Sequence, residues 1–168
     1  MTTTATTDVV VKISNLSWLH GKWSGPGNGI YPTIKPFKYT ENLKFKFNGK
    51  QIEYKQTTLS ASGQLMHFET GLVRVLPTGR IEMTIVQGSG VADFYEGTLE
   101  TKDNMTSLTF KMTHISRSPC AREPHVTNAL RQFTLDTSNN TLHVYMEMAT
   151  TTTPQLVEHL RSELKKLQ

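Results

Sequence analysis

The stretch Gly21-Lys-Trp-Ser-Gly-Pro-Gly-Asn-Gly-Ile-Tyr-Pro-Thr-Ile34 separates two possible kinds of protein. Dense glycines let a backbone pass close to another group or adopt a positive φ. They are typical of phosphate loops and also of the opening strand of small ligand-binding β-barrels. A phosphate loop would lead into a helix, whose N-terminus holds the anion. Here Ile-Tyr-Pro-Thr-Ile follows, and a residue before proline avoids the helical region. The barrel interpretation is therefore favoured, with Trp23 plugging one end, although Trp23 could equally fill an ordinary core.

Short segments with alternating polar and apolar residues follow along most of the chain. Leu43–Phe47 alternates strictly, Asn48-Gly49 suits a two-residue hairpin turn, and Ile52–Tyr54 resumes the alternation. Similar pairs of segments flank turn residues at 77–79, 102–104 and 137–140. The pattern predicts about eight to ten short strands in an antiparallel barrel or sandwich. Closure into a barrel would remove exposed edges and leave room for one small ligand.

The C-terminal segment departs from this alternation. Thr153-Pro154 is a good helix start, with a capping hydroxyl and a proline at the first helical position. Four leucines then recur at helical spacing, and two lysines suit a helix C-terminus; these residues are Leu156, Leu160, Leu164, Leu167, Lys165 and Lys166. The sequence therefore predicts a C-terminal helix, with His159 at the edge of its apolar face.

The composition is that of one soluble globular domain. Of the 168 residues, 36% are hydrophobic and 19% charged, and no apolar run is long enough to span a membrane. We expect a disordered threonine-rich tail at residues 1–12 and a single domain at 13–168. The tail has neither the charge nor the apolar block of a targeting signal.

Charge and cysteine content narrow the function classes. The net charge is +4, but the cations are scattered apart from Lys165-Lys166, so nucleic-acid binding is a weak alternative. The single cysteine, Cys120, excludes an internal disulfide and a cysteine-rich zinc site. It favours a cytoplasmic location, with a nuclear one also open.

Few residues have an obvious chemical role. His159 could offer a neutral imidazole to a metal such as iron, or could be a core histidine bonded to a carbonyl. Met66 and His67 are adjacent, so on a regular strand only one could line a cavity; both could if the chain bends after Ser62-Gly63. Arg122, in a loop, could contact a carboxylate or simply be exposed.

Taken together, the chain resembles the nitrobindins, a family of haem-binding β-barrels with the shape of fatty-acid-binding proteins. The resemblance covers about residues 13 to 168 and is most similar, in its C-terminal half, to the nitrobindin domain that follows a THAP-type zinc finger in some animal proteins. It rests on an ordered set of motifs: Gly21-x-Trp23-x-Gly25-x-Gly27, Tyr31-Pro-Thr-Ile34, Phe37-x-Tyr39, Met66-His67-x-Glu69, Ala121-Arg-Glu-Pro-His-Val126, Met148-Ala-Thr-Thr-Thr and His159-Leu160.

The resemblance implies a ten-stranded antiparallel barrel of calycin type that holds one non-covalent haem b per subunit. His159 would be the axial iron ligand, Thr33 would border the haem, and Met66 and His67 would lie on its opposite face. Arg122 stands where relatives often have lysine and could bind a propionate. The implied activity is isomerisation of peroxynitrite to nitrate by ferric haem, with reversible nitric oxide binding as a second role.

One alternative from another class stays open. The barrel could carry a small apolar ligand such as a fatty acid, without haem chemistry. Phe45, Phe47, Tyr54 and Phe68 could line the cavity of such a carrier as easily as they could fill a core. The sequence leaves a homodimer open and gives no reason to expect a membrane partner.

Overall fold

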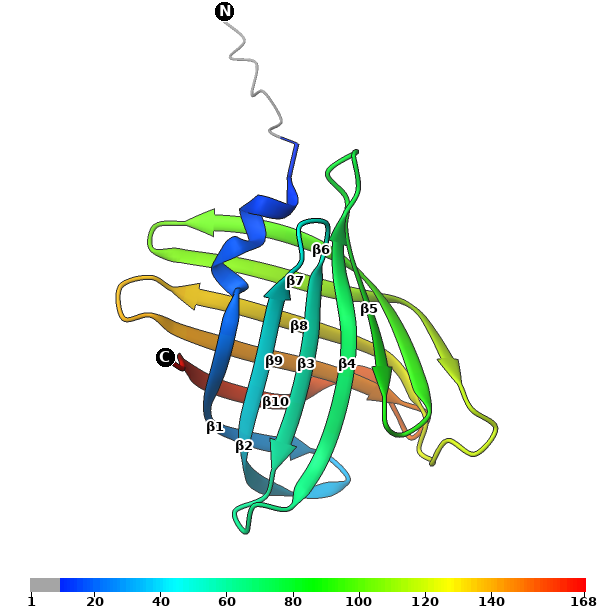
Figure 1. The fold of residues 1–168 in the computed structure, drawn as a ribbon. Coiled ribbons are helices and arrows are strands. Elements are labelled where there is room, and N and C mark those ends of the chain that lie inside the picture. Colours follow the sequence, from blue (N-terminus) through cyan, green and yellow to red (C-terminus); the bar gives the residue numbers. More distant parts are fainter. Residues whose placement is uncertain (1–9) are drawn as a thin grey trace, which may run out of the picture.

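Ten antiparallel strands close into a single barrel in the computed structural model, which describes residues 10–168 (Figure 1). A 3-10 helix, η1 (Ile13–Leu19), precedes the strands. The strands are β1 (Gly21–Tyr31), β2 (Ile34–Phe47), β3 (Ile52–Leu59), β4 (Leu65–Val75), β5 (Ile81–Gln87), β6 (Val91–Lys102), β7 (Met105–Arg117), β8 (Val126–Asp136), β9 (Thr141–Thr150) and β10 (Thr153–Lys166). Each strand pairs with its sequence neighbours, and β1 pairs with β10 to close the ring. The predicted ten-stranded barrel is confirmed.

The predicted C-terminal helix is wrong, because residues 153–166 form β10. This strand hydrogen-bonds to β9 on one side and to β1 on the other, so it supplies the closing edge of the barrel. A leucine spacing of four is also a multiple of two, so Leu160 and Leu164 fit one face of a strand as well as one face of a helix, while Leu156 is exposed. As a strand, this segment hydrogen-bonds to the open edges of both β1 and β9, and this outweighs the local helical preference.

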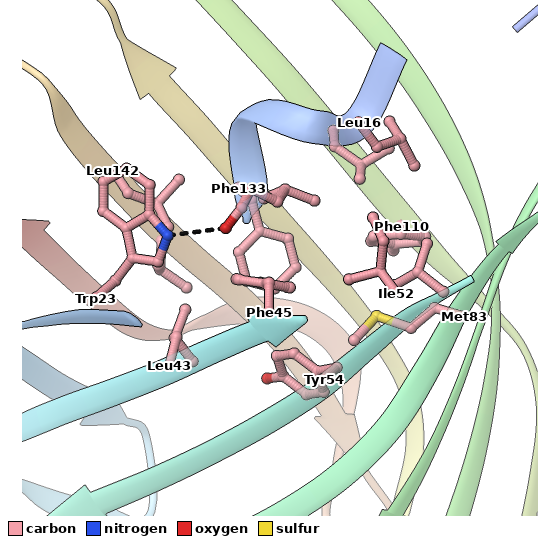
Figure 2. Close-up of a cluster of buried hydrophobic side chains, with 14 of the residues drawn as sticks. Leu16, Trp23, Leu43, Phe45, Ile52, Tyr54, Met83, Phe110, Phe133 and Leu142 are labelled. Carbon is pink, nitrogen blue, oxygen red and sulfur yellow. Dashed lines mark hydrogen bonds between the residues drawn. The ribbon is translucent and has the colours of Figure 1, made fainter. Parts of the chain in front are cut away.

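The end of the barrel nearest the N-terminus is filled by side chains. The indole of Trp23 is buried, and its Nε1 donates to the carbonyl oxygen of Leu19 at 2.9 Å, which ties η1 to the first strand. Figure 2 shows this bond beside the packed rings of Phe45 and Phe133, with Leu16 of η1 above them. Trp23 therefore plugs this end of the barrel, and the cavity that contains His159 lies away from it.

The glycines of the opening motif make room for their neighbours. A Cβ at Gly25 would overlap the backbone carbonyl of Glu163 on β10. A Cβ at Gly27 would overlap the ring of Tyr39, and one at Gly29 would overlap the ring of Phe37; these are the cross-strand partners on β2. The motif thus lets two aromatic rings lie flat across β1.

The junction between η1 and β1 is formed by a glycine. Gly21 has φ +125° there, a conformation that favours glycine. The predicted tail at residues 1–12 falls mostly outside the described residues. Within residues 10–168, no helix has the length and apolar character needed to cross a membrane.

Candidate functional site

A cavity of about 260 Å³ lies in the half of the barrel away from Trp23. One part of its wall is apolar or sulfur-bearing and comprises Phe37, Met66, Met112, Val126, Ala129, Met146, Met148 and Leu160. The other part is polar and comprises Tyr39, Gln56, Thr58, His67, Glu69, Gln87, Asp93, Tyr95, Arg131 and His159. A mostly apolar pocket with a few convergent polar groups is the usual form of a cofactor site.

His159 lies on the wall at an irregularity in two strand pairings. In the β10–β9 pairing, Glu158 and Leu160 face consecutive residues, so His159 is the extra residue of a bulge. The β10–β1 register ends at Leu160 and Gly29, one residue short of His159 and Ile30. The imidazole Nδ1 lies 3.0 Å from the carbonyl oxygen of Ile30. A carbonyl only accepts, so Nδ1 carries the proton and Nε2 keeps its lone pair.

Two aromatic rings hold the imidazole of His159 in place. The ring centroid of Tyr31 is 5.3 Å away and that of Phe37 6.4 Å away, both edge-on. The hydroxyl of Tyr31 is held by the Met148 carbonyl and the Thr150 side chain, at 3.3 and 3.4 Å. Phe37 in turn rests on Gly29. The orientation of His159 is therefore set by packing as well as by its hydrogen bond.

Burial lowers the pKa of His159 below the usual 6.5. Nearby positive charge at His67 and Arg131 lowers the pKa further, while the bond to the Ile30 carbonyl opposes both effects. The imidazole is therefore neutral at pH 7. A neutral imidazole with a fixed tautomer is the form that ligates a metal.

The inner wall of the cavity is built around the carboxylate of Glu69, which is completely buried. Arg131 approaches it with both terminal nitrogens, at 2.5 and 3.0 Å. The hydroxyl of Tyr54 donates to it at 2.7 Å, and His67 Nε2 lies 3.0 Å from it. Burial alone would raise the pKa of Glu69, but the charge of Arg131 and the bonds from His67 and Arg131 lower it to about 2. Glu69 and Arg131 thus form a compensated ion pair.

Two other buried carboxyls lie near this pair. Asp93 accepts hydrogen bonds from Gln87 and Tyr95, and burial raises its pKa. Glu41 accepts from Gln56 and Ser162, and burial raises its pKa as well. In both groups, burial shifts the equilibrium toward the protonated carboxyl relative to an exposed carboxyl.

The structure brings together three of the five residues predicted to contact haem. His159, Met66 and His67 all line the cavity. Met66 and His67 can do so together because Met66 is the extra residue of a bulge in β4, between the pairs Leu59↔Leu65 and Thr58↔His67. The irregularity thus lies at Met66 and not directly after Ser62-Gly63, and Met66 lines the cavity while remaining 46% exposed.

The other two predicted residues lie outside the cavity wall. Thr33 is exposed in the turn between β1 and β2, and Arg122 is exposed in the loop between β7 and β8. Their contacts with a haem edge or propionate stay predictions.

The aromatic residues proposed for an apolar carrier do not line this cavity. Phe45 and Tyr54 belong to the packed core, Phe47 is exposed, and Phe68 lies beneath the ammonium of Lys55. The cavity is instead lined in part by the buried ion pair of Glu69 and Arg131. This arrangement does not favour a fatty-acid carrier.

Sequence reasoning assigned no role to the buried charged residues on the inner wall and directly behind it. Glu41, Glu69, Asp93 and Arg131 each lie among inward-facing positions of their strands, at the period of two that marks buried neighbours. A charge at an inward position is the signal that could have identified them, since such residues are rarely buried unless paired. What no local pattern supplies is the partner: Glu69 and Arg131 are 62 positions apart.

The donor set suits a haem. One neutral imidazole nitrogen is available to an iron, methionine and aromatic side chains surround it, and the Tyr39 hydroxyl on the wall is buried without a hydrogen-bond partner. A planar apolar macrocycle with an axial histidine matches these features.

Comparison with known proteins agrees with this geometry. Residues 12–166 match the family described as THAP4-like, heme-binding beta-barrel domain. "Peroxynitrite isomerase 1" of Mycolicibacterium paratuberculosis is 33% identical over 162 residues, covering 95% of this chain and 98% of that protein. Human "Peroxynitrite isomerase THAP4" is 33% identical over 168 residues, covering 92% of this chain and 27% of that protein. The crystal structure of Rv2717c from M. tuberculosis superposes with a TM-score of 0.84 at 31% identity, covering 93% of this chain and 97% of the other. The chain therefore belongs to the THAP4-like, haem-binding β-barrel family.

Proposed function

We propose that this protein binds one haem b without a covalent link and isomerises peroxynitrite to nitrate on the ferric form. The observation that carries the proposal is the bond from His159 Nδ1 to the Ile30 carbonyl, which leaves a neutral Nε2 at the cavity wall. The names of the bacterial and human relatives support the same activity. Reversible nitric oxide binding at the same site is part of the proposal.

When bound, ferric haem supplies the iron on which the O–O bond of peroxynitrite rearranges. The chain would hold the iron through Nε2 of His159 and would leave room for a small ligand on the side lined by Met66 and His67. Phe37 and Met148 exclude water from the wall near the imidazole. Peroxynitrite and nitrate are anions of the same composition, so the conversion involves no net proton transfer.

His67 is the polar group best placed to limit what enters. Its Nε2 is tied to Glu69, and Glu69 is fixed in turn by Arg131 and Tyr54. The imidazole ring is thereby held against the wall of the cavity. In this proposal, Met66 beside it would line the same side of the haem, while Thr33 and Arg122 would contact the haem edge.

The test is the decay of peroxynitrite in a stopped-flow instrument, with nitrate measured as product. The haem-loaded wild type is expected to accelerate decay and to convert most of the substrate to nitrate. His159→Ala should lose the acceleration, and added imidazole should restore part of it. The matched control is His143→Ala, which removes a partly exposed histidine on β9 that does not line the cavity. Equal acceleration by free haemin and by the loaded protein would refute the proposal.

A further inference from the structure

Tyr39 occupies an unusual position in the cavity. It lies on β2, it is only 4% exposed, and its side chain lines the cavity that contains His159. Its hydroxyl has no hydrogen-bond partner in residues 10–168. Buried polar groups are nearly always bonded, so an unbonded phenol facing a cavity calls for an explanation.

The chain has five tyrosines, and the other four hydroxyls are all engaged. Their partners are as follows: Met148 and Thr150 for Tyr31, Gln56 and Glu69 for Tyr54, Asp93 and Arg131 for Tyr95, and Glu147 for Tyr145. Of these four, Tyr95 also lines the cavity, but the guanidinium of Arg131 contacts its oxygen at 3.1 Å. A phenol beside a positive charge gives up an electron less readily. Tyr39 is thus the cavity tyrosine whose O–H is least restrained.

The surroundings of Tyr39 hold its ring near the iron ligand. The ring rests on Gly27, where no side chain could fit. Its centroid is 5.9 Å from that of Phe37, which packs edge-on against His159. Ser162, which lies close to the phenol, donates its own hydrogen bond to Glu41. Burial raises the pKa of Tyr39, so the phenol stays protonated and can give up a hydrogen atom.

We propose, as a consequence of the function proposed above, that Tyr39 is the site at which nitrogen dioxide formed in the cavity reacts with the protein, giving 3-nitrotyrosine. Breaking the O–O bond of peroxynitrite yields nitrogen dioxide before nitrate is complete, and a molecule that leaves the iron meets the cavity wall first. Tyr39 thus serves as a modification site that keeps the radical from the rest of the chain.

The step balances in atoms and electrons. When nitrogen dioxide leaves, the third oxygen of peroxynitrite and one oxidising equivalent would stay with the haem. That equivalent would take the hydrogen atom from the Tyr39 hydroxyl, which releases the oxygen as hydroxide, returns the haem to the ferric form and leaves a tyrosyl radical. Nitrogen dioxide then forms a C–N bond at the ring carbon next to the oxygen-bearing carbon, and the hydrogen on that ring carbon moves to the oxygen, which restores the phenol. One peroxynitrite is consumed for each nitrotyrosine and each hydroxide formed.

The experiment compares the five tyrosines within one molecule. Haem-loaded and haem-free full-length protein receive the same small pulses of peroxynitrite, and peptide mass spectrometry measures nitration at each tyrosine. In the loaded protein, we expect several-fold more nitration at Tyr39 than at the partly exposed Tyr145. In the haem-free protein, Tyr145 should be nitrated most, because the radical then arises in bulk solvent.

Nitrate yield, recorded in parallel, separates this proposal from the function it depends on. Accelerated nitrate formation with Tyr39 unmodified would overturn the proposal and leave the function standing. No acceleration would overturn both, because the source of the radical would be absent. Tyr39→Phe keeps the ring and removes the hydroxyl, and it should lower total nitration of the loaded chain to the haem-free level. If Tyr95 were nitrated in its place to the same extent, Tyr39 would have no special role and the proposal would fail.

Discussion

The carbonyl oxygen of Ile30 accepts a hydrogen bond from Nδ1 of His159 at 3.0 Å, at a point where the strand ladders on both sides break. His159 is the bulged residue of β10, and Ile30 follows the last β1–β10 pair, Gly29↔Leu160. The irregularity frees a backbone acceptor that a regular ladder would have used. The fold thereby fixes which imidazole nitrogen is left to bind a metal.

The packing of the Phe37 ring against Gly29 should control haem affinity. In Gly29→Ala, the new Cβ would overlap the Phe37 ring and push it toward His159. Haemin affinity is expected to fall about tenfold, which corresponds to about 1.4 kcal/mol. Adding Phe37→Leu should recover much of the loss, because the smaller side chain makes room. Haemin titration followed by absorbance checks this. Gly88→Ala is the control, since its Cβ would meet only ordinary contacts. Equal haemin affinity of the wild type and Gly29→Ala would contradict the role of this packing contact.

Removing only one partner of the Glu69–Arg131 ion pair should destabilise the protein more than removing both partners. Arg131→Met leaves a buried carboxylate without its compensating charge, so the free energy of unfolding should fall by about 3–5 kcal/mol. The double variant Glu69→Gln with Arg131→Met should be markedly more stable than the single one. Urea unfolding gives both values. Arg161→Met, which breaks an exposed pair with Glu158, should cost about 0.5 kcal/mol or less. An equally small loss of unfolding free energy in Arg131→Met would refute the stabilising role of the buried pair.

Glu41 should make stability fall with rising pH. Burial raises its pKa in the folded protein above the usual 4.5, so the folded state favours the protonated carboxyl. The stabilisation is present below pH 4.5 and is lost as the pH rises through the folded pKa. Glu41→Gln mimics the neutral carboxyl, so it should gain stability relative to the wild type from pH 5 to pH 8. Chemical unfolding at several pH values tests this, with the exposed Glu163→Gln as control. A constant difference between wild type and Glu41→Gln across that range would be the contrary result.

His67 should influence the titration of His159. Positive charge on His67 is one of the causes that lower the pKa of His159, after burial. His67→Gln removes that charge, so the pKa of His159 in the haem-free protein should rise toward 6.5. Nuclear magnetic resonance titration of the imidazole gives the value directly, and His143→Gln serves as control. If the two variants give the same pKa for His159, the electrostatic link across the cavity is absent.

Alternation and turn residues predict about eight to ten strands, and the resemblance specifies ten. The secondary structure of residues 153–166 could not be predicted, because leucines four apart fit both a helix and a strand and only pairing with β1 and β9 decides between them. Residue type and position mark His159, Met66 and His67 as candidates, and the resemblance supplies their roles. That all three reach the cavity depends on bulges in β4 and β10, which arise from pairing with neighbouring strands and leave no local mark.

In the proposed function, His159 holds the haem iron. The most direct measurement is a haemin titration of the wild type, His159→Ala and His67→Ala, followed by the Soret band. We expect the wild type and His67→Ala to bind one haemin per chain with the spectrum of a histidine-ligated haem. His159→Ala should lose that spectrum and regain it with added imidazole. A His159→Ala protein with the wild-type spectrum and affinity would contradict the central claim.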